Sequence, residues 1–366
     1  MSRNYHQPYI SFVIVGRNDD HGGDFNERLQ KTIEWVSRHT EKFQIPTEFI
    51  FVNYNPLLNR PSIREIVQWP ENRKFLEFRM INVPLSAHEK LIDTDVRATV
   101  PLFEFPAKNI GIRRARGEFV ISTNADLIFS PEIFSFFSKR KLKKTGYYRA
   151  NRYDFNAIEN YDLEKPGRLL VQIRKNVFAI HLKGWGYQLN GRRSYRAQLL
   201  FYKIFNRLRL FYDLNLLKFD NYCRRKGFFD SHTLYKYGVE VILQNGWHVA
   251  LSYHTNASGD FMLMHRHHWH KLRGYPENTY LNLHTDAIFT IAAAVKGLKE
   301  NVVPWPIFHQ DHGRVLEYDD KKNQDARDML EKLVNDGNKM EKEKKPIIYN
   351  DENWGWGSDE FDEEIF

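Results

Sequence analysis

Runs of apolar residues alternate with amphipathic segments through the first third of the chain, and this order predicts strands alternating with helices. Residues 9–16, YISFVIVG, form an unbroken apolar run, which is typical of a parallel strand buried on both faces. Similar runs at 48–53 and 78–83 predict two more strands, and a fourth run, EFVIST, ends at Thr123. Strands and helices in this order favour an open, mostly parallel α/β sheet.

The segments between these runs carry helix signals. A helix is expected from about residue 25 to residue 40, with a buried stripe formed by Phe25, Leu29, Ile33 and Val36. Asp24 followed by Glu27 predicts a capping box at its start, with Asp in the place of Ser or Thr. Pro106 opens a second helix, and Gly117 is expected to end it.

Positive charge is concentrated in one segment. The 366 residues carry a formal net charge of +8, which taken alone would suggest a nucleic-acid-binding protein. Segment 191–226 contains ten Lys or Arg and two Asp, so the rest of the chain is close to neutral. We therefore assign the basicity to an insert at 190–227 and expect no nucleic-acid partner. Its helical spacing of apolar residues fits an interfacial helix on an anionic membrane and equally a helix packed on the rest of the protein.

Composition also indicates the cellular compartment in which we expect the protein. The single cysteine, Cys223, cannot form an intramolecular disulfide, which favours a reducing compartment. The apolar run near the N-terminus is too short for a signal peptide, and no stretch approaches the ~20 apolar residues that cross a bilayer. We expect a cytoplasmic protein, soluble or peripheral on a membrane. Residues 321–366 predict a charged surface helix and an acidic tail that folds over the basic insert.

Asn124 and Asp126 follow the fourth predicted strand with one residue between them. Oxygen-bearing side chains at i and i+2 lie on one side of a strand and can hold a hard cation, as phosphate chemistry requires. A turn that uses Asn and Asp for their local preferences would give the same residues. The loops after Gly16 and Asn53 are expected at the same carboxyl edge, where this architecture binds ligands.

Six segments occur in a recognisable order. They are AKNIGIRRARGEFVISTNADLIFS at 107–130, SFVIVGRNDD and EFIFVNYNP before it, and GDFMLMHRHHWHKLRGYPE, LHTDAIFTIAAAVKG and WPIFHQDHG after it. The set resembles that of family-2-type glycosyltransferases of the GT-A fold, in a largely uncharacterised subgroup, over about two thirds of the chain. In that family the central block carries an Asp-x-Asp-like metal motif. Here Asn124 replaces its first acid and Asn53 replaces an acid that often ends the second strand, so less negative charge reaches a cation.

The resemblance implies a Rossmann-like GT-A domain with helices on both faces of a mostly parallel sheet. Residues 1–189 would form its nucleotide-sugar-binding half and residues 228–320 its acceptor half. The implied activity is inverting transfer of a sugar from a nucleotide-diphosphate sugar to a hydroxyl of a glycan, glycolipid or glycoprotein. Mn²⁺ or Mg²⁺ would assist, since a mixed oxygen site suits them better than zinc.

The resemblance also distributes roles among residues. Asp126 is the expected metal ligand with His309 as the second, and His312 competes with His309. Asp286 is the expected base and Asp260 the alternative acid, although an acid at a helix start is also a common cap. The expected nucleotide-binding residues are Gly16, Arg17, Asn18, Asn53, Lys108, Asn109, Arg113 and Asn124. Aromatic candidates for stacking on sugars are Trp185, Tyr275 and Trp305.

Two other functions stay open at this point. A nucleotidyltransferase shares the sheet and the metal-diphosphate chemistry, but it usually opens with a glycine-rich phosphate loop, and the glycines of GRNDDHGG stand apart. A non-catalytic nucleotide- or sugar-binding protein would explain the lost first acid. The histidines of 265–270, HRHHWH, lack companion ligands at a zinc-site spacing, so we interpret this segment as an ordinary strand-to-helix turn.

Overall fold

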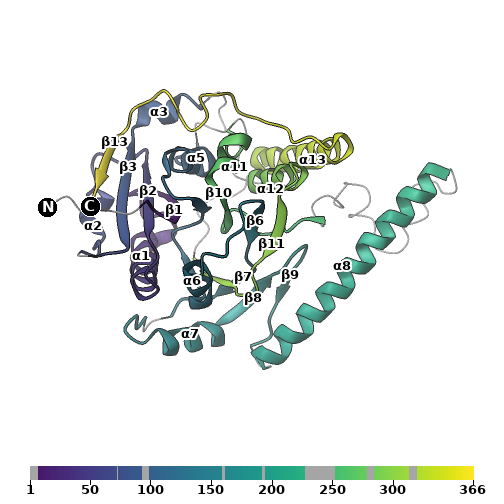
Figure 1. The fold of residues 1–366 in the computed structure, drawn as a ribbon, viewed down its shortest axis with the longest axis horizontal. Coiled ribbons are helices and arrows are strands. Elements are labelled where there is room, and N and C mark those ends of the chain that lie inside the picture. Colours follow the sequence, from purple (N-terminus) through teal and green to yellow (C-terminus); the bar gives the residue numbers. More distant parts are fainter. Residues whose placement is uncertain are drawn as a thin grey trace.

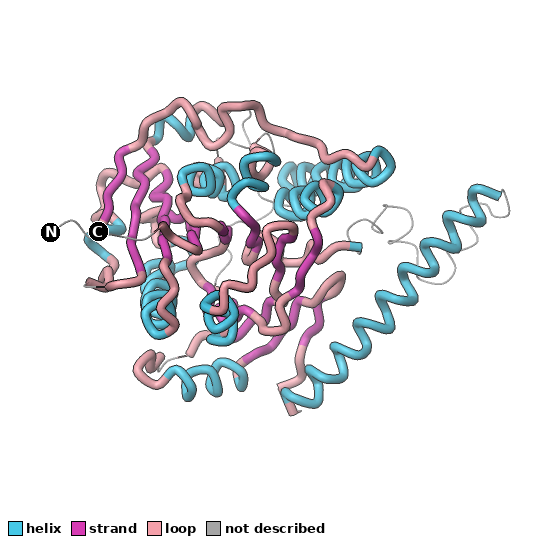
Figure 2. Tube along the Cα trace, in the orientation of Figure 1, coloured by secondary structure: helices cyan, strands magenta, loops and turns pink. Residues whose placement is uncertain are grey.

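The computed structural model describes residues 7–71, 73–92, 99–158, 161–191, 194–226, 252–277, 284–312 and 320–366. These residues form two sheets with helices packed around them (Figures 1 and 2). The predicted α/β class is confirmed, and helices cover both faces of the larger sheet. Within the described residues, no helix is both long enough and apolar enough to span a lipid bilayer.

The larger sheet has the strand order β11-β6-β10-β4-β1-β2-β3-β13 in the described part of the chain. Its four parallel central strands are β1 (Ile10–Gly16), β2 (Thr47–Tyr54), β3 (Leu76–Val83) and β4 (Phe119–Ser122). The outer strands are β6 (Gly146–Arg149), β10 (Met262–His265), β11 (Lys299–Val302) and β13 (Asp362–Ile365). Each central strand begins and ends within two residues of its predicted apolar run.

The strand order reverses between β1 and β4. From β1 the chain proceeds to β2 and β3 on one side and later returns to place β4 on the other. In open α/β sheets, ligands bind outside the carboxyl ends of the strands at such a reversal. The segments leaving β1 and β4 at this edge are 17–24 and 123–126. The topology therefore brings the end of β4 to the place where this architecture has its binding crevice.

A smaller sheet begins directly after the end of β4, with the order β5-β12-β7-β8-β9 in the described residues. Its strands are β5 (Leu127–Phe129), β7 (Arg152–Phe155), β8 (Val177–His181), β9 (Gly186–Gln188) and β12 (Ile307–Gln310). His309 on β12 is in register with Leu127 on β5 and with Asp154 on β7. This pairing carries a late segment of the chain to the end of β4.

Helices α1 (Phe25–Lys42) and α6 (Pro131–Ser138) pack on one face of the larger sheet. Helices α5 (Glu104–Arg114), α11 (Arg266–Leu272) and α12 (Thr285–Val295) pack on the other. The remaining described helices are η1 (His21–Gly23), α2 (Ile63–Ile66), α3 (Leu85–Glu89), α7 (Pro166–Lys175), α8 (Tyr195–Lys226) and α13 (Asp320–Glu343).

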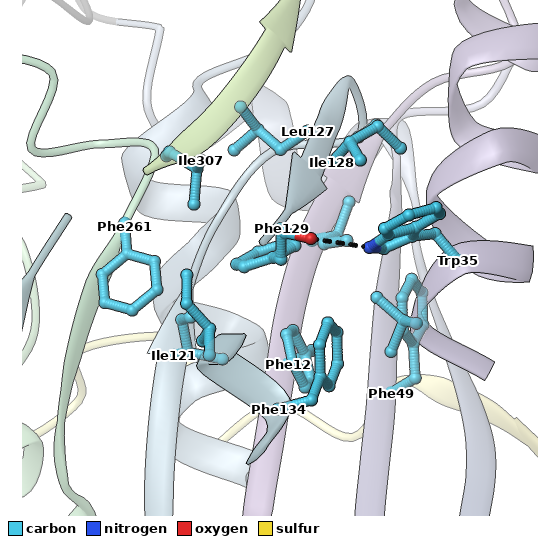
Figure 3. Close-up of a cluster of buried hydrophobic side chains, with 14 of the residues drawn as sticks. Phe12, Trp35, Phe49, Ile121, Leu127, Ile128, Phe129, Phe134, Phe261 and Ile307 are labelled. Carbon is cyan, nitrogen blue, oxygen red and sulfur yellow. Dashed lines mark hydrogen bonds between the residues drawn. The ribbon is translucent and has the colours of Figure 1, made fainter. Parts of the chain in front are cut away.

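The core on the α1 face fixes the β4–β5 connection. Trp35 packs among Phe12, Phe49 and Phe134, and its indole Nε1 donates a hydrogen bond of 2.8 Å to the carbonyl of Phe129 (Figure 3). One turn earlier, the hydroxyl of Thr32 donates to the carbonyl of Ala125 at 2.6 Å. Because both bonds come from one rigid helix, the residues on either side of Asp126 have little freedom to move.

The start of α1 differs from the prediction. Asp24 occupies the N-cap position but makes no side-chain capping bond, so the expected capping box with Glu27 is wrong. The Asp24 carboxylate instead accepts a hydrogen bond of 2.7 Å from Nε of Arg28. A charged guanidinium is a stronger donor than a backbone amide, and Arg28 is buried here, which explains why it takes this carboxylate.

The acidic tail does not fold over the basic insert, so that prediction is also wrong. The segment before β13 crosses α5, where Arg114 donates to the carbonyls of Gly355, Trp356 and Asp359. Strand β13 then pairs antiparallel with β3 at the edge of the larger sheet, far from α8 in Figure 1. The tail is held there because its tryptophans are buried and its last strand completes the sheet edge.

Candidate functional site

Asp126 meets two histidines at the end of β4. Its Oδ2 lies 3.3 Å from Nε2 of His312 and 3.6 Å from Nε2 of His309. One ligand atom from each of the three residues lies within 4.8 Å of the others. Both histidines that competed in the sequence therefore reach the same carboxylate. The other oxygen of Asp126, Oδ1, is buried and accepts no hydrogen bond from the described residues.

Buried positive charge surrounds this carboxylate. Arg28 on α1 places Nη1 3.3 Å from Oδ2 of Asp126. Burial alone would raise the pKa of Asp126, but the neighbouring His309 and His312 hold that pKa well below its usual range. Burial would likewise lower the pKa of His309, but the charge of Asp126 and a hydrogen bond with Asp154 raise it to about 10. Without a cation, the His309 ring is thus protonated and balances Asp126.

The three side chains fit a divalent cation. One carboxylate oxygen and two imidazole nitrogens form a mixed donor set that leaves several coordination positions for other ligands. Mg²⁺ prefers oxygen ligands almost exclusively, so this set favours Mn²⁺ over Mg²⁺. Imidazole must be neutral to bind a metal, and a cation here would therefore displace the proton of His309. The buried, unbonded Oδ1 of Asp126 is a further available oxygen.

Asn124 does not belong to this group. Its amide oxygen accepts a hydrogen bond of 2.5 Å from Nζ of Lys108, and its amide nitrogen donates to Oδ1 of Asp260 at 2.7 Å. Lys108 is fully buried and also donates to Glu104 and to the carbonyl of Gly259. Lys108 and Asn124 are therefore engaged with each other and with neighbouring protein groups.

A second carboxylate holds the far side of the His309 ring. Oδ1 of Asp154 lies 3.4 Å from Nδ1 of His309, and its Oδ2 lies 2.9 Å from Nε2 of His181. Arg152 pairs with Asp154 and reaches Asp260 at 2.8 Å. Burial opposes the charge of Asp154, but the hydrogen bonds with the two histidines keep its pKa far below the usual range. Negative and positive side chains thus alternate in the order Asp126, His309, Asp154, Arg152 and Asp260.

The two predicted acids flank one turn. Asp260 is the last residue of the turn and pairs with Arg152 and Asn124. Asp286, in the first turn of α12, accepts hydrogen bonds at Oδ2 from the Ser258 hydroxyl at 2.7 Å and from the Gly259 amide at 2.6 Å. The structure therefore places both acids at the same turn, and the charged side chains of His309, Asp154 and Arg152 link Asp260 to Asp126.

Buried Arg149 supports the same turn. Its guanidinium donates to the backbone carbonyls of His254, Asn256 and Ser258. Its side chain is fully buried, so these carbonyls satisfy a charge that has no access to water. The turn that carries Asp260 is consequently a rigid part of the site.

The residues predicted after β1 and β2 lie together at the carboxyl edge. Gly16 is required by packing, because a Cβ there would lie 2.2 Å from the ring of Phe25. Asn18 is buried and holds Leu57 with two hydrogen bonds, of 2.9 Å from its amide nitrogen and 2.7 Å to its oxygen. Arg17 donates to the carbonyl of Asn55 at 2.6 Å. Asn53 donates to Asn82 at 2.9 Å, across β2 and β3.

A cavity of about 660 Å³ opens beside these residues. Its wall includes Arg17, Asn55, Leu57, Asn82, Val83 and Leu85. The size lies in the range of sites for small organic molecules, and its mostly apolar wall with a few polar groups is typical of such sites.

Asn109 and Arg113 lie elsewhere. Asn109 is buried on α5 and bonds both the amide and the carbonyl of Tyr275 at 2.8 Å. Arg113 donates to the carbonyls of Glu352 and Trp354 in the tail. Both side chains thus hold the tail and the 275–277 segment against α5, and the structure does not bring them to Asp126.

The aromatic candidates and the histidine-rich segment make packing contacts with the rest of the protein. Tyr275 is fully buried against Phe105 and Phe289, so its ring has no face for a sugar. Trp185 lies under the guanidinium of Arg209, and Trp305 packs against Phe136. In segment 265–270 Trp269 is buried, and among the described residues these histidines form no metal-ligating group.

Sequence reasoning missed Arg28, Arg152, Asp154 and His181. The alternating charges of RYDF, residues 152–155, look like the exposed face of an ordinary strand. Their role appears only when β12 and β8 pair on either side of β7. Arg28 had one signal, since it stands next to Leu29 in the apolar stripe of α1.

Comparisons with known proteins add little to this geometry. No family model matches the chain, and no curated protein matches its sequence. One similar solved structure is that of GalNAc-T7 with UDP, GalNAc and Mn²⁺, with 11% sequence identity and a TM-score of 0.42. The alignment covers 96% of this chain and 54% of that one, so the chain spans about half the length of the structure it matches.

Proposed function

We propose that this protein is a metal-assisted glycosyltransferase that uses a nucleotide-diphosphate sugar. The observation that supports this most directly is the meeting of Asp126, His309 and His312 at the reversal of the strand order. A cation held there would neutralise charge on the diphosphate as it leaves the sugar. The order of sequence motifs supports the narrower assignment to family-2-type enzymes of the GT-A fold.

The donor would extend from the cavity beside β2 and β3 to the three metal ligands. The 17–24 loop connects the two places, since Arg17 lines the cavity and the ring of His21 lies 6.3 Å from that of His312. Four residues of extended chain span at most about 14 Å, which limits the separation of the two ends. A nucleoside in the cavity would therefore place its phosphates toward Asp126.

Asp286 is the base that we propose for an inverting reaction, with Asp260 as the alternative. Asp260 is paired with Arg152, whereas in the part of the chain that the structure describes Asp286 accepts hydrogen bonds from the neutral donors of Ser258, Gly259 and Ala287. A carboxylate without an ion-pair partner takes a proton from an acceptor hydroxyl more readily. The acceptor would be a hydroxyl of a glycan or of a lipid- or protein-linked sugar. As a further partner, we propose an anionic membrane surface contacted through α8.

Thermal unfolding with and without UDP, GDP and Mn²⁺ tests the proposal. UDP or GDP at about 100 times its dissociation constant should raise the melting temperature by about 3 °C, and only when Mn²⁺ is present. If nucleotide bound equally well with and without Mn²⁺, and neither sugar transfer nor donor hydrolysis occurred, the result would favour the non-catalytic binding protein. Formation of a nucleotide sugar from a nucleoside triphosphate and a sugar phosphate would favour a nucleotidyltransferase. Absence of any nucleotide binding would exclude both transferases and a nucleotide-binding protein, and would leave a protein that binds sugars.

A further inference from the structure

A second cavity, of about 520 Å³, lies between α7 and the first turns of α8. Four basic residues line it: Arg174 and Lys175 from α7, and Arg196 and Lys203 from α8. None of the four forms an ion pair with a carboxylate in the part of the chain that the structure describes, and no acidic residue is among the lining residues. Uncompensated cations around one hollow create a positive potential that attracts an anion.

The rest of the wall suits an organic phosphate better than a bare inorganic ion. Tyr153, Val171, Leu199 and Pro306 give it an apolar side. Tyr195 also lines the cavity, and burial raises the pKa of its hydroxyl to about 12, so the hydroxyl keeps its proton and can donate a hydrogen bond. The volume is large enough for a phosphate group together with the atoms that carry it.

Helix α8 turns an apolar face to solvent next to this cavity. Six large apolar side chains on it are between 41% and 72% exposed: Leu200, Phe201, Ile204, Phe205, Leu208 and Phe211. Their spacing of one, three or four residues places them on one side of the helix. The exposed cations Arg196 and Arg207 stand beside them. Scattered exposed apolar residues are ordinary, but a continuous row of six marks an interaction surface.

The opposite face of α8 is anchored, so the apolar face cannot turn inward. Asn206 is buried, accepts a hydrogen bond of 2.8 Å from the hydroxyl of Tyr187 and donates one of 3.0 Å to the carbonyl of Lys183. Arg209 stacks on Trp185, and Tyr202 stacks on Tyr187. The helix is therefore fixed to the smaller sheet by its polar and aromatic side. In Figure 1 its C-terminal end stands away from both sheets.

We propose that α8 lies on an anionic phospholipid membrane, with its apolar face in the interface and a lipid phosphate group in the α7–α8 cavity. This proposal rests on the membrane partner named under the proposed function and adds which residues of α7 and α8 would contact the lipid. Charge decides between a membrane and a second copy of the chain. Two copies joined through this face would bring Arg196, Arg207 and their neighbours against like charges, whereas an anionic surface neutralises them.

Co-sedimentation with lipid vesicles, without nucleotide or metal, tests this independently of glycosyl transfer. The protein should bind vesicles of phosphatidylcholine with about one third phosphatidylserine, and should bind pure phosphatidylcholine far more weakly. The double substitution Arg174→Gln/Lys175→Gln should weaken binding by about 30-fold, because each basic residue near such a surface contributes about fivefold. Lys139→Gln/Lys141→Gln removes the same charge from exposed positions next to α6 and should leave binding within about twofold.

The apolar face has its own variant and control. Phe201→Ser/Leu208→Ser should reduce vesicle binding at least tenfold, and Val302→Ser/Ile348→Ser, at exposed apolar positions elsewhere, should not. The charge-conserving pair Arg174→Lys/Lys175→Arg should retain binding, which separates loss of charge from misfolding. Equal binding to neutral vesicles would overturn the proposal. Binding of glycerol 3-phosphate through Arg174 and Lys175 without vesicle binding, or a dimer that Phe201→Ser/Leu208→Ser dissociates, would also overturn it.

Discussion

Nδ1 of His309 lies 3.4 Å from Oδ1 of Asp154, while Nε2 of the same ring faces Asp126. The imidazole, on β12, is thus held between two carboxylates, one on β7 and one in the segment that follows β4. A carboxylate that accepts the second ring proton of a ligating histidine fixes the tautomer and the ring orientation. Asp154 is therefore a positioning residue for a cation held by Asp126, His309 and His312.

Asp154→Asn should weaken Mn²⁺ binding by about 10- to 100-fold, because the amide no longer balances the His309 ring. Asp126→Ala should abolish Mn²⁺-dependent binding of UDP altogether. Isothermal titration with Mn²⁺, in the presence and absence of UDP, measures both effects. Asp162→Asn, at a partly exposed acidic position that pairs with Lys165, is the control and should bind Mn²⁺ like the parent protein. Unchanged Mn²⁺ affinity in Asp126→Ala would remove Asp126 from the metal site.

Asp286→Asn should spare UDP and Mn²⁺ binding but lower kcat by about 10²- to 10⁴-fold, because an amide cannot accept the acceptor's proton. Ser258→Ala is the matched control, since it removes one hydrogen bond to Asp286 and keeps the carboxylate. Its kcat should fall less than about tenfold. If Asp286→Asn transferred sugar at the parental rate, Asp286 would not be the base, and Asp260 or another group would have to take that role.

Ser86→Trp should block the cavity at the carboxyl ends of β2 and β3. Ser86 lines this cavity at an exposed position, so the larger side chain can enter it without disturbing the core. UDP affinity should fall at least tenfold while Mn²⁺ binding in the absence of nucleotide stays unchanged. Ser86→Ala should leave both affinities intact. If UDP bound equally well to Ser86→Trp, the nucleoside would have to occupy another place.

Glu277 should make the stability of the molecule depend on pH. Burial raises the pKa of Glu277 from 4.5 to about 7, and hydrogen bonds from Asn109 and Gly355 offset only part of that rise. The folded state therefore binds this proton more tightly than the unfolded state. The resulting contribution is complete below about pH 4.5 and is lost as the pH rises through 7.

Glu277→Gln should remove this dependence. Both hydrogen bonds end on Oε1, and the amide oxygen of Gln can accept them in the same way. Between pH 5 and pH 8, the free energy of unfolding of the parent should fall relative to the variant by roughly 2–3 kcal/mol. Urea unfolding at a series of pH values measures the difference. Parallel curves for the two proteins would show that Glu277 is charged in the folded state at all these pH values.

Glu48→Gln should destabilise the fold without affecting the site. The Glu48 carboxylate is fully buried near the start of β2 and binds Ser11, Arg79 and Arg116. Removing one charge from such a cluster leaves buried cations without their partner and costs about 3 kcal/mol. Glu132→Gln, at an exposed position on α6, should change stability by less than about 0.5 kcal/mol. We expect the nucleotide at the carboxyl ends of the strands, and Glu48 lies near the opposite end of β2. Loss of UDP affinity in folded Glu48→Gln would contradict this arrangement.

The central strands were predictable because both of their faces are buried. A strand in that environment must be apolar at every position, so β1, β2 and β3 stand out from the sequence without knowledge of their partners. The place of Asp126 at the edge of the sheet was predictable for a related reason, since the residue closely follows such a strand. His309 and Asp286 required the resemblance of ordered motifs, because neither carries a local signal of its own.

Two physical causes explain which side-chain contacts could not be predicted from the sequence. Helix α5 is buried along almost its whole circumference, so periodicity gave no indication that Asn109 faces Tyr275 and that Arg113 faces the tail. The pairing of Arg152 and Asp154 with Asp260 and His309 depends on strands that are distant in sequence. Contacts of that kind leave no local pattern, and no single segment could have predicted the charged network.

Strand β13 (Asp362–Ile365) pairs with β3 (Leu76–Val83), so the ribosome synthesises the border strand of the larger sheet long after the strand that it covers. Until then, β3 presents its unpaired amides and carbonyls to other nascent chains. Phe366 then stacks on Phe78 and closes this border. The edge of β3 is open to aggregation only before β13 has been synthesised. Expression temperature and the rate of synthesis should therefore change the amount of aggregated protein more than they change the stability of the folded protein.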